Sequence, residues 1–229
     1  MCEMLANYLN QFSERLNIEI DFFIEQINTN LNYISAYDRF IKNNEQFINV
    51  NPVNQAEFFQ LAYDLHHSSF PYLVNSSLLI TFDSYFDDKF FKLTEQTSLI
   101  LLNKFHVKNA NGTYIYKCFD YFCQELDIDL LSKNSTWISL KHNHRIRNLI
   151  VHHNSCLLEN IAVSELVMTV LKIKTHKEYD IIHNCKFINL NELTGKFYIT
   201  DNDFLICYLE DVRAFLIKVI ELIKAKMNL

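Results

Sequence analysis

Turn-forming residues are scarce in this chain, and that scarcity restricts the folds open to it. Its 229 residues include only two glycines and two prolines. Sandwiches, barrels and Rossmann sheets need many tight turns, and tight turns are rich in glycine and proline. Gly112 and Gly195 are also too far apart in the chain to form a glycine-rich phosphate loop. We therefore predict an all-α fold.

The composition fits one globular domain, which we expect to span residues 1–229. Hydrophobic residues make up 49% of the chain, charged residues 21%, and the formal net charge is −6. A chain of this composition is too apolar and too weakly charged to be disordered. No signal peptide or membrane-length apolar run is visible, and the six scattered cysteines form no CxxC pair. We expect a cytoplasmic protein with reduced thiols and no membrane contact.

Apolar residues recur at helical spacing through most of the chain. The sequence predicts helices over residues 3–48 (one, or two joined near 28–32), 55–67, 71–93, 95–106, 114–126 and 135–151. A final helix follows the N-cap candidates Asp201 and Asp203. Residues 157–172 fit a helix or a strand. Between residues 179 and 200, short β-leaning runs surround the turn residues 191–195, so we predict a small β-hairpin insertion near residues 179–200.

A segment without acidic residues stands out in this acidic protein. Residues 130–158 contain no Asp or Glu. The same segment holds eight cationic or titratable side chains: Lys133, Lys141, His142, His144, Arg145, Arg147, His152 and His153. Such a patch suits a phosphate-bearing ligand. The alternative is a basic face that pairs with acidic neighbours.

The order of residues within this segment adds a motif. Arg147 and Asn148 are followed, after three residues, by His152. This arrangement resembles the RNxxxH form of the RX4–6H motif of the HEPN superfamily, the higher-eukaryote and prokaryote nucleotide-binding domains. The resemblance implies a helical bundle, a homodimer and a metal-independent endoribonuclease of a toxin or anti-phage abortive-infection system. It implies RNA as substrate, an antitoxin or regulatory protein as partner, and no cofactor or metal.

The resemblance also implies further site residues. The helix expected over residues 71–93 is similar to the family's second core helix, which often carries a polar residue facing the motif. Here that residue is Asp83 or Ser84. We expect supporting roles for Arg145 and His153, and RNA contacts from Lys141, His144 and Arg145. Toxins of this family that pair with a nucleotidyltransferase antitoxin tend to carry a tyrosine two residues after the histidine, whereas this chain has Asn154. Modification of the protein by such an antitoxin is therefore not predicted.

Metal-free RNA cleavage explains why these residue types matter. A base must take the proton of the ribose 2′-OH, an acid must protonate the departing 5′ oxygen, and a cation must stabilise the phosphorane. Histidine titrates near neutrality, and arginine binds phosphate oxygens with its fork of N–H groups. Because in-line attack places base and acid on opposite sides of phosphorus, one histidine cannot readily serve as both. A two-fold dimer would supply a second histidine and a second arginine.

Helical periodicity complicates the motif. At about 100° per residue, Asn148 and His152 share a face with Arg145, whereas Arg147 lies well around the helix. Either the helix breaks near Val151, or Arg147 reaches across the dimer seam, or Arg145 binds part of the phosphate. We place Arg147 first and Arg145 second. Asn148 is expected to orient His152 or the backbone at the break, and the alternative is a helix-ending cap.

Other functions fit parts of the same pattern. One rival is a catalytically inactive HEPN-like dimer that binds RNA, nucleotide or a partner protein. Another is an interaction protein whose basic segment docks on an acidic partner. The histidines of the segment would need Cys or carboxylate ligands to form an ordinary zinc site, so we predict no metal. Tyr116 and its aromatic neighbours can stack on bases or fill the core.

Overall fold

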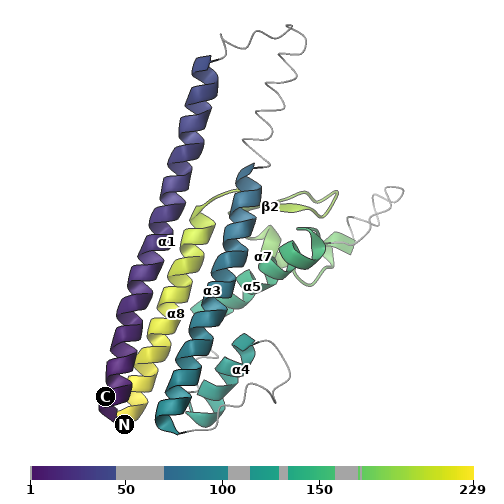
Figure 1. Cartoon of the computed structure of the whole chain (residues 1–229). Helices are drawn as coiled ribbons and strands as arrows, with labels where there is room; N and C mark the ends of the chain where they lie inside the picture. Colours follow the sequence, from purple (N-terminus) through teal and green to yellow (C-terminus); the bar gives the residue numbers. More distant parts are fainter. Residues whose placement is uncertain (1, 45–69, 103–113, 129–133, 158–169, 171) are drawn as a thin grey trace. The chain divides into compact units, whose positions relative to one another are not determined.

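The computed structural model describes residues 2–44, 70–102, 114–128, 134–157, 170 and 172–229 (Figure 1). The helices are α1 (Cys2–Asn44), α3 (Phe70–Leu101), α4 (Tyr114–Asp120), α5 (Ser135–His153), α7 (Tyr179–His183) and α8 (Asp203–Met227), with a π-helical turn η4 (Tyr121–Glu125). The strands β1 (Ile188–Leu190) and β2 (Phe197–Ile199) form one antiparallel hairpin. The prediction of a helical fold with a small hairpin is confirmed. Among the described helices, none combines the length and the apolar character that crossing a membrane requires.

One predicted boundary within α3 is wrong. The helices expected over residues 71–93 and 95–106 are a single helix as far as Leu101. Thr94, which stands at the expected boundary, lies inside this helix, where it is buried and its hydroxyl donates to the Phe90 carbonyl at 2.7 Å. A threonine that bonds back to its own helix needs no turn to satisfy its side chain.

Residues 179–182, predicted as a β-leaning run, form helix α7 instead. The amide of Ile182 donates to the Glu178 carbonyl at 3.2 Å. The rings of Tyr179 and His183 stack with centroids 4.9 Å apart, as residues one helical turn apart can. The hairpin is therefore confined to the strands β1 and β2. The predicted helix over residues 55–67 and most of the ambiguous stretch 157–172 lie outside the described residues.

The chain forms two compact units. The first unit comprises Met1–Phe22, Ile80–Arg145 and Cys207–Leu229, and the second unit comprises Phe23–Leu79 and Ile146–Ile206. The helices α1, α3, α5 and α8 each contribute to both units. The single domain expected over residues 1–229 stays a prediction.

In the first unit, parts of α1, α3 and α8 run side by side, and the start of α1 lies at the same end as the end of α8 (Figure 1). Buried aromatic rings fill its core, with the Phe215 ring 5.2 Å from both Phe90 and Trp137 between centroids. Polar contacts join the helices at the surface. Lys89 forms an ion pair with Glu19, whose carboxylate also accepts from the Tyr85 hydroxyl at 2.8 Å.

In the second unit, the hairpin packs against the beginning of α3. Strands β1 and β2 pair in register, with Ile188 opposite Ile199. The buried Asn75 amide of α3 donates to the Ile199 carbonyl at 3.3 Å. The Tyr72 ring meets the Tyr198 ring edge-on at 4.9 Å between centroids. These contacts fix the hairpin to α3.

Candidate functional site

The helix α5 carries the whole predicted motif. It begins at Ser135, where the Asn134 side chain accepts from the Thr136 amide at 2.9 Å, as an N-cap does. The helix continues without interruption to His153. A break near Val151 is therefore wrong, and so is the alternative that Asn148 caps the helix end.

Arg147 and Asn148 contact each other directly. The guanidinium Nη1 of Arg147 donates to Oδ1 of Asn148 at 2.9 Å, and both side chains are half-buried. This bond restricts the orientation of the guanidinium, which is the group that binds phosphate oxygens. His152 is exposed on the last turn of the helix, and the neighbouring His153 is half-buried.

The chain leaves α5 in a defined conformation immediately after these histidines. Asn154 and Ser155 both have a positive φ, of 49° and 57°. This left-handed turn ends the helix, and the Ser155 amide donates to the Leu149 carbonyl at 3.1 Å. Asparagine tolerates the left-handed region better than most residues, so Asn154 suits its position.

The hairpin holds this end of α5. The Phe197 amide of β2 donates to the Ser155 carbonyl at 2.9 Å, and the Leu157 amide donates to the Gly195 carbonyl at 2.9 Å. The Ser155 hydroxyl also bonds to the Tyr72 hydroxyl of α3. The predicted insertion thus anchors the helix end that carries His152. Sequence reasoning did not find this role, because hydrogen bonds across about forty residues leave no local pattern.

A second pair of predicted residues lies in the first unit. Asp83 of α3 is 1% exposed, and its Oδ2 lies 2.9 Å from Nδ1 of His144 on α5. Its Oδ1 accepts from the Tyr208 hydroxyl of α8 at 3.0 Å. Of the two residues that the resemblance offered, Asp83 is the buried one. Ser84 is exposed and donates to the Ile80 carbonyl of its own helix.

Sequence reasoning missed Tyr208. Tyr208 lies in the predicted final helix and is fully buried. Its hydroxyl nevertheless takes part in the Asp83 network. Buried tyrosines usually need a hydrogen-bond partner, and that requirement was the only signal in the sequence.

Lys141 and Arg145 place positive charge around His142 on α5. Burial lowers the pKa of His142, and the positive charges of Arg145 and Lys141 lower it further. Arg145 is exposed and Lys141 is half-buried. In the part of the chain that the structure describes, neither Lys141 nor Arg145 forms an ion pair. Their charges are therefore not balanced by acidic neighbours within that part, which suits an anionic ligand.

A metal site is a separate question. Among the described residues, no group of three or more His, Cys, Asp or Glu side chains is arranged to hold a metal ion. Histidine and arginine together can catalyse phosphodiester cleavage by proton transfer and charge stabilisation alone. The second unit thus offers a guanidinium bonded to Asn148, with an exposed imidazole five positions further along α5, and the first unit offers a carboxylate-oriented imidazole beside a lysine.

The function of this chain has to be inferred from the chemistry of these residues. Comparisons with models of known protein families, with curated proteins and with solved structures give no match.

Proposed function

We propose that the protein is a metal-independent endoribonuclease of the HEPN type, a cytoplasmic toxin or anti-phage abortive-infection effector that works as a homodimer. The observation that carries the proposal is the Arg147–Asn148–His152 motif at the end of one uninterrupted helix. His152 is exposed there, and Asn148 holds the Arg147 guanidinium. The toxin or defence role, and restraint by an antitoxin or regulatory protein, follow from the family resemblance.

Each residue has a defined part in the proposed reaction. The ribose 2′ oxygen attacks phosphorus, a histidine removes its proton, and the bond from phosphorus to the 5′ oxygen breaks. A second histidine protonates the leaving 5′ oxygen, so the products are a 2′,3′-cyclic phosphate and a 5′-OH. Arg147 stabilises the charge that builds on the non-bridging oxygens. His152 supplies the imidazole, the kind of side chain that most readily gives and takes a proton near neutral pH.

The unbroken helix favours a site shared between two subunits. Arg147 and His152 are five positions apart, which places them about 140° apart around the helix at about 100° per residue. With the break near Val151 excluded, an arginine and a histidine from one subunit do not converge easily on one phosphate. A two-fold axis brings the partner's copies to the same cleft.

The test is digestion of purified tRNA, rRNA and mRNA transcripts with and without EDTA. The unmodified protein is expected to cleave in both conditions and to leave 2′,3′-cyclic phosphate ends. His152→Ala is expected to lower the rate by about 100-fold or more, the usual contribution of a general acid or base. His183→Ala is the matched control, because it removes another exposed histidine of the second unit and is expected to keep full activity.

Three outcomes contradict the proposal. Cleavage that EDTA abolishes would indicate a metal-dependent nuclease. Cleavage that survives in His152→Ala would remove the motif from the reaction. If the unmodified protein cleaves none of the RNA classes, the inactive dimer that binds RNA, nucleotide or a partner protein replaces the enzyme.

A further inference from the structure

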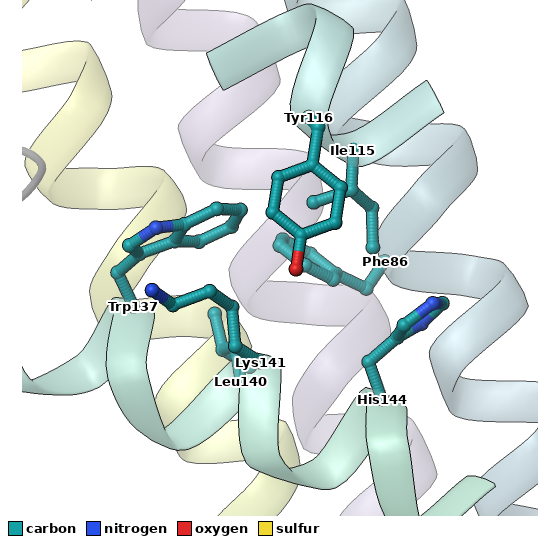
Figure 2. Close-up of a pocket in the computed structure, with 7 residues that line it drawn as sticks. All are labelled: Phe86, Ile115, Tyr116, Trp137, Leu140, Lys141 and His144. Carbon is teal, nitrogen blue, oxygen red and sulfur yellow. The ribbon is translucent and has the colours of Figure 1, made fainter. Parts of the chain in front are cut away.

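A small pocket in the first unit brings together aromatic side chains, a lysine and a histidine that have no part in the proposed cleavage step. Figure 2 shows the Tyr116 ring and Lys141 on opposite sides of it, with Trp137 and His144 at its two ends. Tyr116 comes from α4, whereas the other three residues come from α5. Phe86 contributes to the apolar wall.

The imidazole of His144 is held in place from behind. The Asp83 carboxylate lies 2.9 Å from its Nδ1, and Asp83 is itself fixed by the Tyr208 hydroxyl. The ring is therefore held in one orientation at the end of the pocket.

A buried aspartate–histidine pair needs an explanation beyond stability. Replacing such a pair by apolar residues of similar volume is often neutral or stabilising, because both groups lose hydration. Ionisable side chains that are held by a charged partner are common at binding and catalytic sites as well as in structural pairs. Asp83 and His144 lie beside an aromatic pocket and a lysine, so ligand binding is the function that fits them.

The remaining walls of the pocket match the two parts of a nucleotide. Tyr116 is 42% exposed, which leaves part of its ring for stacking. Its inner side meets the Trp137 ring edge-on, with centroids 6.2 Å apart, so the tyrosine is supported. The Lys141 Nζ lies 5.8 Å from the centroid of the Trp137 ring. Exposed aromatic rings bind bases of single-stranded nucleic acid, and lysine binds phosphate.

The size of the pocket decides how a ligand would sit. The space open to the centres of water-sized molecules is about 10 Å³, which is room for about one water. Neither a base nor a phosphate fits inside, and the surface that lines the pocket is mostly apolar. The base would therefore stack on the exposed part of Tyr116, and the phosphate would lie at the mouth of the pocket beside Lys141 and His144, which are one helical turn apart on α5.

We propose that this pocket is a substrate subsite, in which Tyr116 stacks on one base of a single-stranded RNA while Lys141 and the Asp83-oriented His144 bind its phosphate. The inference rests on the proposed function, since its ligand is a segment of the RNA substrate. It assigns binding, not cleavage, to these residues.

The test measures binding of a labelled 2′-O-methyl oligoribonucleotide, which lacks the attacking hydroxyl and cannot be cleaved by this route. Fluorescence anisotropy gives the dissociation constant. Trp137 is the only tryptophan of the chain, so a change in its emission on titration locates the bound strand at the pocket. We expect saturable binding, with a change in Trp137 emission at the same concentrations.

Variants separate stacking from charge. Tyr116→Ala is expected to weaken binding about fivefold to 100-fold, the usual effect of losing one stacked base, whereas Tyr116→Phe keeps the ring and the affinity. Lys141→Ala is expected to weaken binding and to reduce its salt dependence. Lys218→Ala is the matched control, because it removes a half-exposed lysine of α8 in the same unit and is expected to bind as the unmodified protein does.

The subsite is overturned if Tyr116→Ala and Lys141→Ala both bind within twofold of Lys218→Ala, or if the unmodified protein does not bind the strand. A Trp137 emission that stays constant through saturation overturns it as well. Each result is distinct from failure of the proposed function, because cleavage that depends on His152 can persist without this subsite. Conversely, the subsite can bind RNA in a protein that does not cleave.

Discussion

At the scale of single residues, the Asp83 carboxylate of α3 joins three helices, because it contacts His144 of α5 and Tyr208 of α8. A carboxylate that is 1% exposed loses nearly all of its hydration, and only partners in the protein can offset that loss. Here His144 and Tyr208 supply them from two other helices. Removing the carboxylate leaves a buried hydroxyl and an imidazole without their acceptor, which costs more than losing an exposed charge.

Asp83→Ala is therefore expected to lower the free energy of unfolding by about 3–5 kcal/mol. Urea denaturation followed by Trp137 fluorescence measures this change. Asp88→Ala is the matched control on the same helix, because Asp88 is half-exposed and pairs with Lys92. Its expected cost is at most about 1 kcal/mol. Equal costs for the two variants would contradict the structural role given to Asp83.

At the scale of elements, the hairpin supports the end of α5. Gly195 lies in the turn between the strands with φ of +72°, and its carbonyl accepts from the Leu157 amide. A Cβ at this position would lie 3.3 Å from Cγ1 of Ile173. The conformation and the close approach both favour glycine here.

Gly195→Ala is accordingly expected to lower the free energy of unfolding by about 1–2 kcal/mol, the cost of a left-handed residue with a Cβ. Because the turn holds the segment after His152, RNA cleavage should slow as well, measured at a temperature where the variant remains folded. Leu193→Ala is the control, since Leu193 is 58% exposed in the same turn. Its expected change in unfolding free energy is within about 0.5 kcal/mol. A Gly195→Ala variant that behaves like Leu193→Ala would remove the anchoring role of the hairpin.

At the scale of the whole molecule, the proposed cleft needs two subunits. If both histidines of a cleft take part, a dimer with one His152→Ala subunit is inactive. The unmodified protein is mixed with an equal amount of His152→Ala, and the subunits exchange at random. About a quarter of the dimers then carry two intact copies of His152. Because mixing doubles the number of dimers, the cleavage rate should fall to about half of the rate before mixing. The measurement is the RNA cleavage rate before and after exchange, with differently tagged subunits to confirm that mixed dimers form.

The control for this experiment adds His183→Ala instead. Its subunits keep His152, so the rate should rise to about twice the original value. An unchanged rate after verified exchange with His152→Ala would mean that each subunit cleaves RNA by itself. Arg147 and His152 of one chain would then have to act together despite their separation around α5.

The sequence alone determined the helical class and the position of the catalytic candidates. Scarce glycine and proline, with apolar residues at helical spacing, predicted the final helix that α8 forms and predicted α5 from its first residue to within two residues of its end. The hairpin was predicted from its turn residues. These features depend on local propensity, periodicity and turn chemistry, all of which operate over a few residues. The motif of Arg147, Asn148 and His152 was visible for the same reason.

Only the tertiary structure decided which distant residues meet. Asp83 and His144 lie 61 positions apart in the chain, and Asp83 and Tyr208 lie 125 apart. No periodicity relates such positions, so the choice of Asp83 over Ser84 and the part played by Tyr208 required the packed helices. The continuation of α3 through Thr94 and the helical turn of α7 were decided likewise by hydrogen bonds and burial that the folded chain provides. Local sequence sets what each segment prefers, whereas long-range packing selects the partners that satisfy its buried polar groups.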